Sequence, residues 1–342
     1  YDTMMERIRS VIGERTIDNV IVQHAEPDHS GGFLKFMKDY PNARPYASNA
    51  GVGIMLKQYF KSYDFQRVKT GDTLSTGRYT LTFVEMPMIH WPDNMLTYVA
   101  EQKIAFSNDA FGQHIASYDI FDDAHGAAKC IDRAKDYYAN IVMPYGMQVA
   151  NKLKQIQDMN LDIDMIAPAH GIIWRSYLPE LFQAYEDFAT FKAVDKAVIV
   201  YESVWKHTQM MAEALAEGMG RNGICVKIFK CSMTSPAIIQ KELLDAKAVL
   251  VGSGNYNNAM AGSIAAFLEK LITCKVKNKK GLGFGSYGWA NLVTKEINAR
   301  LGKAGITLLN DEVVSQNYTP SEADLDALME LGKQIAEEIK AM

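Results

Sequence analysis

The second part of the chain alternates between short apolar runs and amphipathic segments, and this alternation restricts the possible folds more than any other feature. From Lys196 onwards, five strands and five helices follow one another over residues 196–342. The predicted strands are Ala197–Tyr201, Cys225–Lys230, Ala248–Gly252, Gly281–Gly285 and Ile306–Val314. Strands that alternate with helices are typical of α/β domains. The sequence therefore predicts an α/β, doubly wound, parallel five-stranded sheet in this part of the chain.

Residues 1–195 show a different order, in which strands come first and helices are added around them. Short β runs are predicted at Asn19–Val22, Tyr79–Glu85, Met95–Val99 and Ile104–Phe106, with helices near 125–157. Apolar residues of Leu178–Ala193 recur at helical spacing, so this segment ends the first domain and leads into the second. We therefore expect an α+β layered sandwich over residues 1–195 and the parallel-sheet domain over residues 196–342.

Charge, hydropathy and cysteine content exclude several classes of protein. The 342 residues include 36 Lys and Arg and 40 Asp and Glu, so no strong positive field favours nucleic acid as a partner. No apolar run approaches the roughly 20 residues of a membrane helix, so we expect no membrane span. The 4 cysteines form no CxxC pair, which favours free thiols in a reducing compartment and hence a cytoplasmic protein.

Four possible metal ligands lie within six residues of the first part, directly after a predicted strand. They are His24, Glu26, Asp28 and His29, on a loop that also contains Pro27 and two glycines. Such a loop can turn several side chains toward one point, whereas a regular strand sends neighbouring side chains to opposite faces. Imidazole and carboxylate without thiolate suit iron, manganese or zinc. The alternative is a solvated polar loop that happens to contain two histidines.

Three further polar residues stand at the ends of apolar runs in the same domain. They are His90, Asp109 and His170. Taken singly, each is more often a buried histidine with a hydrogen-bond partner or a turn-forming aspartate. Together with the loop they supply four imidazoles and three carboxylates at strand ends, which is enough for two metal ions that share one ligand.

Three loops of the second part combine hydroxyls, glycines and aromatic rings at the carboxyl ends of predicted parallel strands, where ligands of such sheets bind. The candidate residues are Ser203, Val204, Trp205, His207 and Thr208 in the first loop, Gly254, Asn255, Tyr256 and Asn257 in the second, and Ser286, Tyr287, Gly288 and Trp289 in the third. Hydroxyls and amides at a helix start can hold a phosphate, and aromatic rings suit a planar flavin. The first strand is not followed by a GxGxxG fingerprint, so FMN is preferred over NAD or FAD. Alternatively, the aromatic residues pack on the domain surface without a ligand.

The order of these motifs resembles that of the flavodiiron proteins. The His-x-Glu-x-Asp-His box followed by His90, Asp109 and the Pro-x-His-Gly at His170 is similar to their metallo-β-lactamase-like domain, a four-layer αββα sandwich, and the second part is similar to their flavodoxin-like domain. Glu26 replaces the histidine that hydrolases of this superfamily usually carry. The resemblance implies one iron held by His24, Glu26 and His90, a second held by Asp28, His29 and His170, and a bridging Asp109.

The resemblance also implies an activity and partners. It indicates an oxidoreductase that accepts electrons at FMN and reduces dioxygen to water, nitric oxide to nitrous oxide, or both, at a non-haem di-iron site. The expected donor is a rubredoxin or a reduced deazaflavin, and the expected assembly is a head-to-tail homodimer or a tetramer. Alternatives from other classes are a zinc-dependent hydrolase and a plain FMN electron carrier. Only 23 residues precede His24, so the resemblance further predicts an N-terminally truncated first domain.

Overall fold

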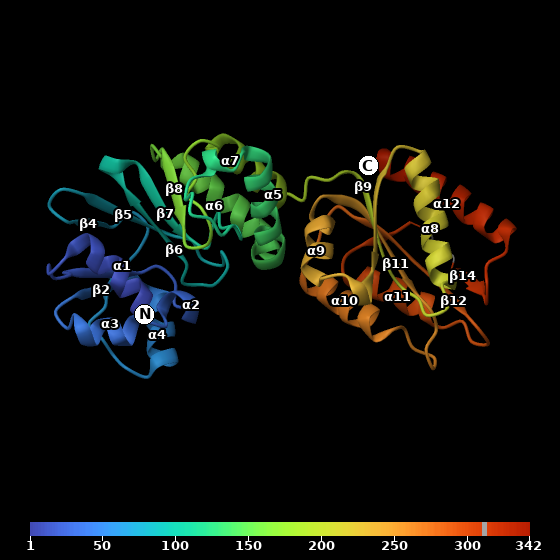
Figure 1. The fold of residues 1–342 in the computed structure, drawn as a ribbon, viewed down its shortest axis with the longest axis horizontal. Coiled ribbons are helices and arrows are strands. Elements are labelled where there is room, and N and C mark those ends of the chain that lie inside the picture. Colours follow the sequence, from blue (N-terminus) through green and yellow to red (C-terminus); the bar gives the residue numbers. More distant parts are fainter. Residues whose placement is uncertain (310–312) are drawn as a thin grey trace. The chain divides into compact units, whose positions relative to one another are not determined.

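The computed structural model describes residues 1–309 and 313–342, which form two units. The first unit comprises Tyr1–Tyr138 and Met147–Glu186, and the second comprises Ala139–Gly146 and Asp187–Met342. The first unit has two sheets and the second has one, and each unit has its own hydrophobic core (Figure 1).

The first unit contains two sheets. The parallel sheet β1-β2-β3 is formed by β1 (Asn19–Val22), β2 (Arg44–Ser48) and β3 (Gln66–Val68). The second sheet has the order β4-β5-β6-β7-β8 and comprises β4 (Thr73–Ser75), β5 (Thr80–Glu85), β6 (Met95–Val99), β7 (Ile104–Asn108) and β8 (Met165–Pro168). Its strands are antiparallel except for the parallel pair β7 and β8. Side chains from both sheets, including Tyr46 of β2 and Phe83 of β5, pack into one cluster between them.

Helices cover the outer faces of these two sheets, which gives the predicted four-layer αββα sandwich. The helices of this unit are α1 (Asp2–Ile12), α2 (Pro27–Ser30), α3 (Phe33–Asp39), α4 (Asn49–Tyr59), α5 (Ala127–Tyr137), α6 (Gly146–Asp158) and α7 (Leu178–Ala189). Apolar residues of α1, α3 and α4 pack on the first sheet in one cluster with Val22 and Ala47. Figure 1 shows α5, α6 and α7 together beside the second sheet.

The second unit is built on one parallel sheet. Its strands are β9 (Val194–Glu202), β10 (Cys225–Lys230), β11 (Ala246–Ser253), β12 (Lys280–Tyr287), β13 (Thr307–Leu308) and β14 (Val314–Asn317). The order β10-β9-β11-β12-β13, with β14 also paired to β12, is the flavodoxin-like strand order. The helices are α8 (His207–Arg221), α9 (Pro236–Leu244), α10 (Gly262–Thr273), α11 (Val293–Lys303) and α12 (Glu322–Lys340). Helices α8 and α12 share one core cluster with the sheet, and α9, α10 and α11 lie on its other face (Figure 1). The predicted doubly wound sheet is therefore confirmed.

The prediction of one continuous strand over Ile306–Val314 is wrong. Leu308 pairs with Gly281 and Val314 pairs with Phe284, so the chain advances six residues where β12 advances three. The short strands β13 and β14 thus pair separately with β12, and residues 310–312 of the predicted strand lie outside the described part. The sequence carried a signal, because Asn310-Asp311-Glu312 interrupts the apolar run.

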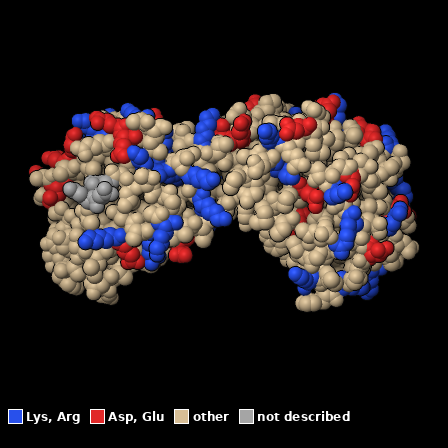
Figure 2. All heavy atoms as spheres, turned by 180° about the vertical axis from the view of Figure 1, so that it is seen from behind, with Lys and Arg blue, Asp and Glu red and all other residues tan. Residues whose placement is uncertain are grey.

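The surface of the protein carries a mixture of charges. Figure 2 shows Lys and Arg side chains interspersed with Asp and Glu over the visible face. All 4 cysteines are free thiols. Among residues 1–309 and 313–342, no helix combines the length and the apolar character that crossing a bilayer requires.

Helices α8 and α12 approach each other closely because glycines face across their contact. A Cβ atom at Gly218 of α8 would lie 2.0 Å from the carbonyl oxygen of Met329, and a Cβ atom at Gly332 of α12 would lie 2.4 Å from that of Leu215. Only residues without a side chain fit there. Together the two helices cover one face of the sheet.

We expect Gly218→Ala to lower the free energy of unfolding by roughly 1–3 kcal/mol, because the added methyl group overpacks the contact. Gly220→Ala is the matched control on the same helix: nothing lies within 4 Å of its Cβ position, and alanine favours a helix by about 1 kcal/mol over glycine. Urea unfolding followed by circular dichroism measures both variants. Equal stability of the two would contradict the close contact.

Candidate metal centre and flavin pocket

The His-x-Glu-x-Asp-His loop lies where β1 gives way to α2. Strand β1 ends at Val22, and α2 begins at Pro27, whose fixed backbone angle suits the first turn of a helix. His24 and Glu26 therefore come before the helix, while Asp28 and His29 lie in its single turn. His90, Asp109 and His170 come from loops that follow β5, β7 and β8. The structure brings all seven predicted residues together in two groups.

The first group contains His24, Glu26 and His90. The Nε2 atoms of His24 and His90 lie 3.2 Å and 3.1 Å from the same carboxylate oxygen, Glu26 Oε2. The His24 side chain is fully buried, whereas that of Glu26 is 32% exposed. This side of the site therefore has one enclosed ligand and one that solvent or a small substrate can reach.

The second group contains Asp28, His29 and His170. The Nε2 atoms of His29 and His170 each lie 3.4 Å from Asp28 Oδ2. All three side chains are partly exposed. The second group is thus the more open of the two.

Asp109 lies between the groups and is almost completely buried. Its Oδ2 atom is 3.4 Å from His24 Nε2 and 3.5 Å from His90 Nε2. Its Oδ1 atom is 3.1 Å from the Nε2 atoms of both His29 and His170. One carboxylate therefore offers one oxygen to each group.

The surroundings of Asp109 favour its charged form. Burial alone opposes ionisation, but hydrogen bonds with His170, His29 and His90 outweigh it and hold the pKa of this carboxyl well below its usual range. The hydrogen bond with Asp109 raises the pKa of His170. Burial lowers the pKa of His90, but Asp109 and Glu26 outweigh burial and raise it. The carboxylate of Asp109 and the imidazoles of His90 and His170 thus favour each other's charged forms.

Three supporting residues were not found by the sequence analysis. Both carboxylate oxygens of Asp93 lie 3.1 Å from His24 Nδ1, and this aspartate also accepts the Ala25 amide proton. The hydroxyl of Tyr137 donates to Asp109 Oδ1 over 3.1 Å, and Asn108 Nδ2 donates to Oδ2 over 3.2 Å. Asp93 stands three residues after His90, and Asn108 directly precedes Asp109, so nearness to a ligand was the available signal. Nothing in the sequence indicates Tyr137.

The spacing of the ligand atoms fits metal ions. Bonds of about 2.0–2.2 Å from a divalent ion to histidine nitrogen and carboxylate oxygen place neighbouring ligand atoms roughly 3.0–3.5 Å apart in tetrahedral or octahedral geometry. The distances from histidine Nε2 to carboxylate oxygen in both groups, including those to Asp109, run from 3.1 to 3.5 Å, and all ligand atoms of a group lie within 4.8 Å of one another. All of the ligand atoms are nitrogen or oxygen, and iron and manganese readily bind such ligands. The residues therefore fit two metal ions.

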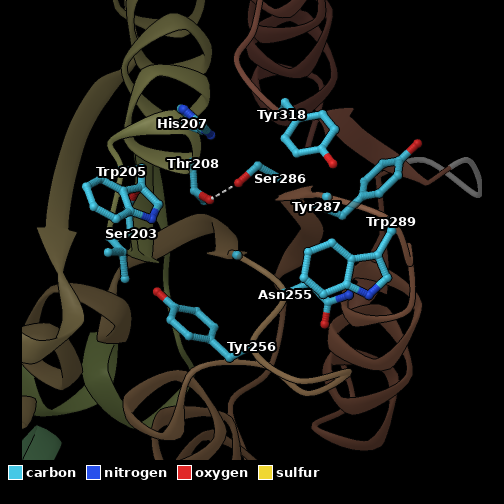
Figure 3. A pocket seen from close by; sticks show the side chains of 13 residues that line it. Ser203, Trp205, His207, Thr208, Asn255, Tyr256, Ser286, Tyr287, Trp289 and Tyr318 are labelled. Carbon is cyan, nitrogen blue, oxygen red and sulfur yellow. Dashed lines mark hydrogen bonds between the residues drawn. The ribbon is translucent and has the colours of Figure 1, made fainter.

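A cavity of about 400 Å³ lies at the carboxyl ends of the strands of the second unit. Twelve of the thirteen predicted cofactor residues line it. Tyr318, which follows β14 and was not predicted, also lines it. The remaining one, Asn257, lies at the exposed tip of a tight turn closed by the bridge between Tyr256 and Ala259. Figure 3 shows Trp205 and Trp289 on opposite sides of the pocket, with Tyr256, Tyr287 and Tyr318 around it.

The floor of the pocket is polar. The hydroxyls of Thr208 and Ser286 are hydrogen-bonded over 2.9 Å and join the first loop to the third (Figure 3). Helix α8 begins at His207, so its free amides and positive dipole end face the pocket. His207 Nε2 lies 3.0 Å from the Thr319 hydroxyl, which fixes the ring at the pocket wall. This end of the pocket suits an anion such as phosphate.

The pocket fits a flavin mononucleotide. Its volume lies in the usual range for cofactor sites, aromatic rings form its walls, and a helix N-terminus offers an anion site. Within the described residues, the buried Oδ1 atom of Asn255 has no hydrogen-bond donor. An N–H group at the edge of a bound ring could supply that donor.

Comparisons with known proteins match both units. A family model described as ODP family beta lactamase matches residues 1–171, and a model described as Flavodoxin matches residues 199–332. The chain is 40% identical over 340 residues to the nitric oxide reductase of Moorella thermoacetica, an alignment that covers 99% of this chain and 85% of that protein. It is 35% identical over 336 residues to the anaerobic nitric oxide reductase flavorubredoxin of Vibrio vulnificus, covering 97% and 68%.

Solved structures show the same architecture. The rubredoxin oxygen:oxidoreductase from the anaerobe Desulfovibrio gigas superposes with a TM-score of 0.94 at 34% identity, covering 98% of this chain and 84% of that one. The flavodiiron protein from Giardia intestinalis superposes with a TM-score of 0.95 at 26% identity, covering 99% and 84%. Since both domain models match in this order and these relatives align along nearly the whole chain, the protein belongs to the flavodiiron protein family.

Proposed function

We propose that this protein is a flavodiiron oxidoreductase that takes electrons at FMN and reduces dioxygen to water, nitric oxide to nitrous oxide, or both, at a non-haem di-iron site. One relative is named a nitric oxide reductase and another a rubredoxin oxygen:oxidoreductase, and this chain aligns with both over at least 98% of its length. The single observation that carries the proposal is the position of Asp109, whose two oxygens face two separate groups of ligands.

The seven side chains would divide between two ions. His24, Glu26 and His90 would hold one iron, Asp28, His29 and His170 would hold the other, and Asp109 would contact both. Iron held by these residues would supply electrons and a place to bind a diatomic gas. Asp93 orients the His24 ring through Nδ1, which is the usual role of a carboxylate behind a metal-bound imidazole.

Tyr137 keeps its proton in this site. Burial and the neighbouring Asp109 raise the pKa of its hydroxyl far above the usual value. The phenol therefore remains a neutral donor to Asp109 Oδ1 near neutral pH. It holds the carboxylate in place without adding a second negative charge.

The second unit would bind FMN. Ser203, Thr208 and the amides at the start of α8 would hold the phosphate, and the aromatic loops would enclose the ring. A flavin supplies a carrier that can take up and release electrons singly or in pairs. The hydrogen bond between Thr208 and Ser286 keeps the phosphate end and the ring end of the pocket in a fixed relation.

Glu26 argues against the zinc hydrolase alternative. Hydrolases that resemble this domain usually have histidine at that place, and here a carboxylate directed at His24 and His90 adds negative charge to the site. Carboxylate-rich sites favour harder ions than zinc. A plain electron carrier would need only the flavin site, so that alternative does not explain why seven possible ligands converge in the first unit.

Several finer points of the sequence analysis are part of the proposal. We propose domains at residues 1–195 and 196–342, an electron donor such as a rubredoxin or a reduced deazaflavin, and a cytoplasmic location. A head-to-tail homodimer or a tetramer follows from the family resemblance alone. The name of the Desulfovibrio gigas relative supports a rubredoxin donor.

Reaction with the gases tests the proposed function directly. We expect FMN in reduced protein that holds two iron ions per chain to be reoxidised by nitric oxide or dioxygen at least tenfold faster than in the same protein stripped of metal. Anaerobic stopped-flow absorbance of the flavin measures both rates, with iron and FMN quantified first. Equal rates would leave only the electron-carrier role, and protein that holds zinc but no flavin would establish the hydrolase.

Removal of the shared carboxylate is expected to affect both metal positions. Asp109→Ala should lower the iron content from two ions per chain to less than one, because each group loses a ligand and a balancing charge. FMN content should stay unchanged. Asp123→Ala, which removes a half-exposed aspartate paired with Arg175, is the control. Two tightly held ions in Asp109→Ala would contradict the bridging role.

Loss of the Thr208 hydroxyl is expected to weaken phosphate binding. Thr208→Val should raise the Kd for FMN about 10- to 100-fold, since hydrogen bonds to charged groups contribute about 1.5–3 kcal/mol. The Kd for riboflavin, which has no phosphate, should change much less. Fluorescence titration of the apoprotein measures both constants, and Thr273→Val at an exposed helix end is the control. An equal loss for both flavins would argue that Thr208 acts only by supporting the loop.

A further inference from the structure

Two loops that carry candidate ligands are joined by backbone hydrogen bonds. One loop follows β7 and carries Asp109, and the other follows β8 and carries His170. The Ala169 amide donates to the Asn108 carbonyl over 2.8 Å, and the Gln113 amide donates to the His170 carbonyl over 3.1 Å. The position of His170 therefore depends on the segment that begins at Asp109.

The side chain of Gln113 strengthens this connection. It is completely buried, its Oε1 atom accepts the Ile172 amide proton over 2.7 Å, and its Nε2 atom donates to the Ile172 carbonyl over 2.8 Å. Rotating the amide by half a turn would set donor against donor and acceptor against acceptor. The reciprocal pair thus fixes both the distance and the orientation of the backbone two residues after His170.

Gly171 allows Gln113 to come this close. Its φ angle is +92°, which is favourable for glycine, and a Cβ atom there would lie 1.4 Å from Gln113 Oε1. The loop that carries His170 therefore lies directly against the glutamine side chain. No larger residue fits between them.

The orientation of the His170 ring depends on its loop more than the orientation of the His24 ring depends on the loop after β1. The His24 ring is held from behind by the Asp93 carboxylate at Nδ1. The polar contacts of the His170 side chain run from Nε2 to Asp28 and Asp109, and within the described part of the chain no hydrogen bond reaches its Nδ1 atom. The His170 ring is therefore oriented from its Nε2 side, by its neighbours His29 and Tyr137, and by the backbone that carries it, with no carboxylate behind Nδ1 among the described residues.

We propose that Gln113 is a positioning residue for His170, and that through the Ile172 backbone it determines how tightly the second of the two metal positions holds its ion. This inference rests on the proposed di-iron site. It predicts an asymmetric effect: loss of the Gln113 amide weakens the position formed by Asp28, His29 and His170 and leaves the position formed by His24, Glu26 and His90 almost unchanged.

The test uses Gln113→Met, which keeps the length of the side chain and removes both hydrogen bonds. The FMN-containing protein is loaded anaerobically with ferrous iron, and the release of iron to a chelator is followed by absorbance. The wild-type protein should release two ions per chain slowly. The variant should release one of its two ions about 10- to 100-fold faster, the usual effect of losing a residue that orients a metal ligand, with FMN content unchanged.

Two comparisons make the result specific. Gln240→Met is the matched control, because Gln240 is also buried but its amide donates to Ala139 and Cys274 in the second unit. It should release both ions at the wild-type rate. In a His170→Ala background, adding Gln113→Met should change iron release no further, since the residue acts through His170.

Each outcome decides a different question. Equal acceleration of both ions, or of neither, would overturn the role of Gln113. Wild-type protein that cannot hold two ions would overturn the proposed function instead. If Gln113→Met does not fold, Gln113→Glu, which keeps the acceptor for the Ile172 amide, replaces it: selective release of one ion supports the proposal, and two equally retained ions overturn it.

Discussion

The buried carboxylate of Asp109 is the constraint on which the first unit depends. A buried charge is costly unless it is paired and hydrogen-bonded, and here four imidazoles, a phenol and an amide surround two oxygens. These groups come from five places in the sequence, from His24 to His170. The carboxylate therefore requires the loops after β1, β5, β7 and β8 to meet at one point.

The same structural rule produces both sites, since functional side chains lie on loops that follow strands. Strands provide rigid starting points, and Pro27 or glycine lets the chain turn sharply after them. In the second unit the loops after β9, β11 and β12 meet where the strand order reverses, and the flavin pocket forms there. Glycines at the contact of α8 and α12 let these two helices lie close together on one face of the sheet that carries those loops.

The sequence predicted more of the sites than of the framework. Ligand types at strand ends were visible as motifs, and the structure brings all seven together, although their role as ligands remains a proposal. Tyr137 and Tyr318 could not be found, because they reach the sites only through the fold and no local sequence pattern marks them. Strands β3 and β4 were missed since they have only three residues each, and β2 and β8 each contain a proline, which argues against a strand. The break between β13 and β14 depends on pairing with β12.

The central claim is that one carboxylate joins two iron positions. Crystals of the iron-loaded protein, measured on both sides of the iron absorption edge, test it most directly. We expect two anomalous peaks per chain, one beside His24, Glu26 and His90 and one beside Asp28, His29 and His170, with Asp109 in contact with both. A single iron peak, or none, would contradict it.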